Sequence, residues 1–70
     1  MKLSARNQLR GTVASVVQDG IMAEVTVRLA GDDTVVSVIT AESARRLGIA
    51  QGQTVTVVIK STEVMLATET

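Results

Sequence analysis

The chain has 70 residues with no cysteine, no histidine and no aromatic residue, and its seven basic and seven acidic side chains give a formal net charge of zero. A single domain this short removes only about 60% of its unfolded surface from water when it folds alone. Without disulfides, and with few ligands for a structural metal, the remaining source of stability is association between copies of the chain. The balanced charge predicts neither a nucleic-acid partner nor binding to a membrane surface.

We expect neither an export signal nor a membrane anchor. Residues 1–10 lack an apolar core, and no later run approaches the roughly 18 apolar residues of a membrane span. A cytoplasmic location is therefore predicted, and the absence of cysteine agrees with it. Because histidine and cysteine are absent and the carboxylates are scattered, we do not expect an enzyme. The adjacent Asp32 and Asp33 are interpreted as a solvated turn rather than a metal site.

Val, Ile and Thr make up over a third of the chain and proline is absent, which favours strands around a thin aliphatic core. Alternating apolar and polar residues, interrupted by turn residues such as Asp19-Gly20, predict the first strands. Gly11 would allow the first of them to bend. The later runs are nearly continuous in apolar residues, as expected when both faces of a strand are covered. The four strands predicted up to this point span residues 9–17, 21–29, 34–39 and 54–59.

One short helix is predicted between the third and fourth strands, over residues 40–48. Thr40 is expected to be its N-cap, because a threonine oxygen can accept a hydrogen bond from a free N–H group of the first turn. Gly48 stands just past the last turn, where a left-handed residue ends many helices. Ala44 and Leu47 would form the apolar face of this helix.

The C-terminal part of the chain completes the predicted fold. Residues 60–63 indicate a break or a single helical turn, and residues 64–67 a last short strand. Five strands with one helix between the third and the fourth are the element order of an OB-like barrel. We therefore predict an all-β fold, a small OB-like five-stranded barrel, in a single domain that spans residues 1–70.

Hydrogen-bond donors gather at the ends of three predicted elements, where free backbone N–H groups also favour an anion. These donor groups are Ser4-Ala5-Arg6-Asn7, Thr40 with Ser43, and Lys60-Ser61. Each group also has an interpretation without a ligand. Thr40 and Ser61 would then only cap helical turns, and Ser43 would be an exposed helix residue. Lys60 would be a surface lysine, and Arg6 would be part of a solvated arm. From the residues alone, both interpretations remain open.

Three segments of the chain, in order, resemble the signatures of the molbindin (Mop) family. Residues 4–11 (SARNQLRG) are similar to its opening signature, residues 39–43 (ITAES) to its mid-chain segment, and residues 58–65 (VIKSTEVM) to its closing signature. The spacing agrees without gaps over essentially the whole chain.

This resemblance implies the Mop fold, assembled as a homohexamer that is a trimer of dimers, with molybdate or tungstate held between subunits. The positions that match the family's main oxyanion site are Ser4, Ala5, Arg6, Asn7, Thr40, Ser43, Lys60 and Ser61. A second site near the three-fold axis would involve Gly20, Ile21 and Met22. Here Gln18-Asp19 stands where lysines are common in relatives, and an aspartate is unfavourable beside an anion.

A shell made only of donors suits molybdate and tungstate, which are fully deprotonated dianions at neutral pH. Phosphate still carries a proton near pH 7, and leaving that proton without an acceptor costs about 1–3 kcal/mol. Together with this donor chemistry, the resemblance implies an oxyanion-binding protein for intracellular storage and homeostasis, with no organic cofactor.

Two other classes of function remain as alternatives. An OB-type nucleic-acid-binding module is disfavoured because the chain has no aromatic residue for base stacking and no basic surplus. The second alternative is a ligand-sensing domain that acts in regulation. Because a single domain fills the given chain, a storage role is favoured over this regulatory role.

Overall fold

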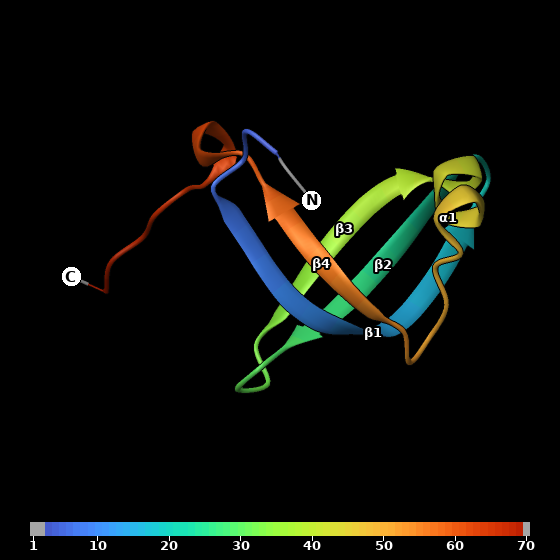
Figure 1. The fold of residues 1–70 in the computed structure, drawn as a ribbon, viewed down its shortest axis with the longest axis horizontal. Helices are drawn as coiled ribbons and strands as arrows, with labels where there is room; N and C mark the ends of the chain where they lie inside the picture. Colours follow the sequence, from blue (N-terminus) through green and yellow to red (C-terminus); the bar gives the residue numbers. More distant parts are fainter. Residues whose placement is uncertain (1–2, 70) are drawn as a thin grey trace.

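The computed structural model describes residues 3–69 and shows an all-β fold with one short α-helix (Figure 1). In chain order the elements are β1 (Asn7–Asp19), β2 (Met22–Leu29), β3 (Thr34–Thr40), α1 (Ala41–Leu47), β4 (Thr54–Ile59) and a 3-10 turn, η1 (Ser61–Glu63). The four predicted strands and the helix between the third and fourth are confirmed. The single helical turn expected after the fourth strand is present as η1.

The strands form one antiparallel sheet in the order β3-β2-β1-β4. The first half of β1 pairs with β4, and its second half pairs with β2, so one long strand connects two hairpin-like arms. A shift of register between Val13 and Ser15 bends β1 where it passes from one arm to the other. Figure 1 shows the resulting curve, which gives the sheet the shape of an open barrel wall.

Gly11 lies next to this bend and allows the strands to approach closely. A Cβ atom on Gly11 would lie 2.8 Å from the carbonyl oxygen of Arg28 and against the side chains of Val27 and Leu29. The backbone oxygen cannot move aside without breaking the pairing of β1 with β2. The sequence pattern predicted a bend at Gly11, but the register shift lies between Val13 and Ser15, and Gly11 provides space for the neighbouring strand.

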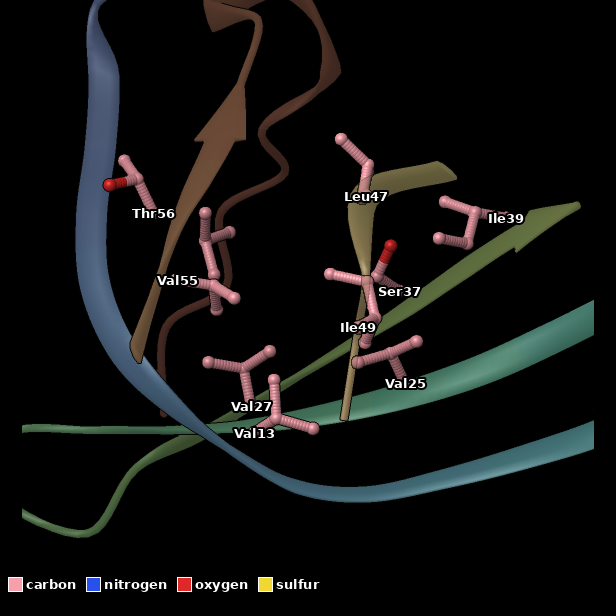
Figure 2. A pocket seen from close by; sticks show the side chains of 10 residues that line it. Val13, Val25, Val27, Ser37, Ile39, Leu47, Ile49, Val55 and Thr56 are labelled. Atoms are coloured by element: carbon pink, nitrogen blue, oxygen red, sulfur yellow. The ribbon is translucent and has the colours of Figure 1, made fainter. Parts of the chain in front are cut away.

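The concave side of the sheet carries a small aliphatic core. Val13, Val25 and Val27 are buried, and five partly buried residues pack against them: Leu29, Ile39, Ile49, Val55 and Val57. This core encloses a hollow of about 150 Å³ that is open to solvent (Figure 2). The radius of gyration is 13.0 Å, against about 11 Å for a compact chain of this length. One copy of the chain therefore has an incompletely covered core.

The expectation that β3 and β4 are covered on both faces is wrong for a single copy of the chain. Their residues alternate between half-buried and exposed, and Val36 and Val38 on β3 are 57% and 59% exposed. A sheet of four strands covers only its concave side, so the apolar residues on the other side remain in contact with water.

The predicted fifth strand over residues 64–67, and with it the closed five-stranded barrel, is not formed. The chain there is extended at Val64 but belongs to no strand, and Met65 and Leu66 are 91% and 93% exposed. A strand is stable only where its backbone groups pair with a neighbour. Figure 1 shows this segment running away from the sheet, so the fold is a four-stranded half-barrel.

The helix α1 has the ends that the sequence predicts. Thr40 is its N-cap, and Gly48 adopts a left-handed conformation (φ 65°). Ile49 N–H donates to the Ala44 carbonyl at 3.0 Å, which closes the last turn. The expected apolar face is partly wrong, because Ala41 is buried with Ala44 while Leu47 is 65% exposed. Within residues 3–69, no helix is long and apolar enough to cross a bilayer.

We expect Gly11→Ala to lower the free energy of unfolding by about 2 kcal/mol, because the added methyl group overpacks a backbone contact. Urea denaturation followed by circular dichroism measures this. Gly48→Ala is the comparison, since nothing lies within 4 Å of the added Cβ there and only the left-handed conformation is penalised, by about 1 kcal/mol. A smaller loss for Gly11→Ala than for Gly48→Ala would contradict the close approach.

Candidate functional site

The residues predicted to bind an anion fall into two clusters at opposite ends of the curled sheet (Figure 1). The first, called here the terminal cluster, comprises Ser4, Ala5, Arg6, Asn7, Lys60 and Ser61. The second, called here the helix cluster, comprises Gly20, Ile21, Met22, Thr40 and Ser43. The thirteen residues of β1 run from the first cluster to the second. The eight predicted main-site residues therefore do not meet within one chain.

The terminal cluster forms where β1 begins and β4 ends. Asn7 is the register partner of Ile59, and the Asn7 side-chain Nδ2 donates a hydrogen bond to the Ile59 carbonyl at 3.2 Å. Gln8 Nε2 donates to the Ala5 carbonyl at 3.1 Å and holds the segment before β1. The Asn7–Ile59 pairing places residues 4–7 at the end of β4 that leads into Lys60, although more than fifty positions separate the two segments in the sequence.

Lys60 and Arg6 supply positive charge to the terminal cluster. Both side chains are exposed, and neither forms a hydrogen bond or an ion pair within the described residues. Lys60 is the N-cap of η1, where its carbonyl accepts from Glu63 N–H at 2.9 Å. Arg6 precedes and Lys60 follows the last register pair of β1 and β4, Asn7 with Ile59. Together with the hydroxyls of Ser4 and Ser61, these two cations form a set of donors that suits an anion.

In the helix cluster, Thr40 and Ser43 are linked by two hydrogen bonds. Thr40 Oγ1 accepts from Ser43 N–H at 3.0 Å, as an N-cap does, and its hydroxyl donates to Ser43 Oγ at 2.8 Å. Arg46 Nη2 donates to the same Ser43 oxygen at 3.3 Å. Because Ser43 Oγ accepts twice, its own hydroxyl proton is available to a ligand.

Sequence reasoning missed Arg46 as part of the helix cluster. Its position three residues after Ser43 was a usable signal, because residues at that spacing are neighbours on a helix surface. The Arg46 guanidinium adds a positive charge beside the neutral hydroxyl groups of Thr40 and Ser43. The two clusters therefore share one composition, namely hydroxyl groups together with cationic donors.

The residues predicted as a second site lie directly beside Thr40. Met22 is the register partner of Thr40, and the Ile21 carbonyl accepts from Ala41 N–H at 2.8 Å. Gly20, in a left-handed conformation (φ 62°), accepts from Gln18 Nε2 at 3.3 Å. An open hollow of about 410 Å³ is lined by Gln18, Gly20, Ile21, Thr40, Ala41, Glu42 and Arg45. The sequence did not predict this juxtaposition, because it depends on the pairing of β2 with β3.

The charges around this hollow have opposite signs. Glu42 is unfavourable to an anion, and Arg45 is favourable. Asp19, which the sequence suggested as the unfavourable neighbour, ends β1 and does not line the hollow.

Comparison with known proteins assigns the family. The family model described as TOBE domain matches residues 3–66. This chain belongs to the TOBE domain family. It is 47% identical to Molybdenum-pterin-binding protein 3 of Clostridium pasteurianum over 66 aligned residues. The alignment covers 94% of this chain and 97% of that protein. This agreement confirms the molbindin (Mop) resemblance of the sequence.

Two solved structures are similar to this TOBE domain. A molybdate-binding protein from Sporomusa ovata superposes with a TM-score of 0.91 at 32% identity, over 97% of this chain and 100% of that one. The cytoplasmic molybdate-binding protein ModG, solved with molybdate bound, superposes with a TM-score of 0.82 at 39% identity, over 94% of this chain and 53% of that one. The all-β half-barrel with one helix is thus the architecture of molybdate-binding proteins of this family.

We expect Thr40→Val to lower the free energy of unfolding of this TOBE domain by about 1 kcal/mol, because valine has the same shape but cannot cap α1. Thr40→Ser keeps the capping oxygen and should cost less. Chemical denaturation of the two variants beside the unmodified chain measures the difference. Equal stability of the valine and serine variants would show that the cap contributes nothing.

Proposed function

We propose that this TOBE domain is a binding protein, not an enzyme, that holds molybdate or tungstate for storage and homeostasis in the cytoplasm. A relative at 47% identity named as a molybdenum-pterin-binding protein and a solved structure at 32% identity named as a molybdate-binding protein support the ligand class. The similarity to ModG, described as cytoplasmic, supports the location. The observation that carries the proposal is the division of the donors into two incomplete clusters at opposite ends of one chain.

The main site in this proposal is shared between two subunits. One subunit contributes the terminal cluster, with Arg6 and Lys60 as its charges, and another contributes Thr40 and Ser43 from its helix cluster. Each half alone is exposed to water, where charge pairs contribute little. Bringing the halves together would surround the anion and exclude water, so each donor would interact with it more strongly.

The donor chemistry favours a metalate over phosphate. Lysine, arginine, serine and threonine side chains all present hydrogens to a ligand, and a fully deprotonated dianion accepts from each of them. A protonated phosphate would turn one hydrogen toward these donors, at a cost of about 1–3 kcal/mol. The Gly20-Ile21-Met22 turn is proposed as part of a second, weaker site, because it offers backbone N–H groups but no side-chain donor, and Glu42 lines the hollow beside it.

The proposed assembly is a homohexamer, a trimer of dimers. The open hollow in the core, the exposed valines of β3 and the exposed Met65 and Leu66 all leave apolar surface that a second copy can cover. The free edges of β3 and β4 could accept residues 64–67 of a partner as the missing strand. An anion bound between subunits would in turn stabilise the assembly.

We expect the protein to bind molybdate and tungstate at micromolar concentration, and Lys60→Ala to weaken this binding by about tenfold to a hundredfold. A hydrogen bond to a charged partner contributes about 1.5–3 kcal/mol, which corresponds to that loss. Ser61→Ala should lose less. Isothermal titration calorimetry with molybdate, tungstate, sulfate and phosphate side by side measures both the affinity and the selectivity.

Two results would refute this prediction. Absence of binding heat for both metalates would refute the ligand class. Equal affinities of the unmodified protein and Lys60→Ala, at unchanged circular dichroism and oligomer size, would remove Lys60 from the site.

For the assembly, light scattering during size-exclusion chromatography should give six times the mass of one chain. Leu66→Asp should shift the protein toward smaller species, because it places a charge in surface that the proposal buries. Gln51→Asp makes the same charge change on an exposed turn before β4 and should keep the hexamer. A stable monomer at tens of micromolar would contradict both the assembly and the shared site.

A further inference from the structure

The outer face of the sheet carries a row of donor residues that lies outside both clusters. Strand register aligns Thr34, Arg28, Thr12 and Thr54 across β3, β2, β1 and β4. Their neighbours along the strands point into the core, so these four side chains lie on the opposite, outer face. Arg10 lies on the same face of β1, two residues before Thr12.

Arg10 and Arg28 line one shallow hollow of about 310 Å³, together with Thr12 and Thr54 and the backbone around Gly11. Neither guanidinium has a hydrogen bond or an ion pair within the described residues. No carboxylate lines the hollow. The acidic residues nearest to Arg28 along the chain, Glu24, Asp32 and Asp33, do not line the hollow and pair with neither arginine.

Two like charges on adjacent strands repel each other, and an anion between them converts this repulsion into attraction. The overall charge of the chain is zero, so the excess of positive charge here is local. The hydroxyls of Thr12 and Thr54 add two further donors at the same hollow. We propose that this outer hollow is an additional binding site for a tetrahedral oxyanion, with Arg10 and Arg28 as its charged ligands.

This outer hollow should differ from the main site in selectivity. It is open to solvent, so a proton on phosphate can donate to water and carries no desolvation cost. Sulfate, phosphate and molybdate should therefore bind here with similar, weak affinities, in the millimolar range. The guanidinium fork matches the oxygens of all three anions.

Residue-resolved NMR titration of the intact protein with sodium sulfate, at constant ionic strength, tests the proposal. The backbone amides of Thr12, Arg28 and Thr54 should shift and saturate, and phosphate should give the same pattern. Arg28→Gln and Arg10→Gln should each weaken this response by about fivefold, as expected for an exposed charged contact. Arg45→Gln removes the same charge at the far end of the sheet and should leave the response unchanged.

Shifts that increase linearly without saturating, or equal affinities in the unmodified protein and both arginine variants, would overturn the site. An equal loss in Arg45→Gln would overturn it too, because the effect would then follow net charge alone. The result is separate from the main site: metalate binding that weakens about tenfold or more in Lys60→Ala, while the sulfate response at Thr12 persists, would uphold both proposals. Absence of metalate binding at micromolar concentration, with the sulfate response intact, would refute only the main site.

Discussion

The shape of this domain depends on one constraint: β1 pairs with two different strands. Its first half is bonded to β4 and its second half to β2, both partners overlap at Gly11 and Thr12, and the register shift between Val13 and Ser15 bends β1 just beyond this overlap. Gly11 lies in this overlap and lets the backbone of β2 approach closely. The curvature of the sheet, the one-sided core and the positions of both donor clusters follow from this bend.

The same bend supports the proposed association in two independent ways. It opens the core on its concave side, so that a few buried residues, chiefly Val13, Val25 and Val27, must stabilise a sheet whose larger apolar residues are mostly half-buried or exposed. It also holds Lys60 and Thr40 at opposite ends of the sheet, so that the donors cannot converge on one ligand within a chain. A second copy would resolve both problems, which is why folding, assembly and ligand binding are expected to be coupled.

Local signals in the sequence predicted those parts of the structure that depend on neighbouring residues. Thr40 and Gly48 marked the ends of α1, and the alternation after Gly20 marked β2. The strand predicted over residues 64–67 failed because a strand needs a partner, and none is available within the described chain. The position of Gly20 and Ile21 beside Thr40 could not be predicted, because it arises from the register of β2 with β3. Arg46 was missed because its role depends on a side-chain contact with Ser43.

The hydrogen bonds of the helix cluster explain how a helix cap can also serve a ligand. Thr40 Oγ1 caps α1 with a lone pair, by accepting from Ser43 N–H, while its single proton points to Ser43 Oγ. Rotation about the Cβ–Oγ bond can turn that proton to an anion without breaking the cap. The exchange gives up one neutral hydrogen bond, of about 1 kcal/mol, for a stronger one to a charged acceptor. Arg46 continues to donate to Ser43 Oγ throughout, so the serine keeps its place when the threonine proton leaves.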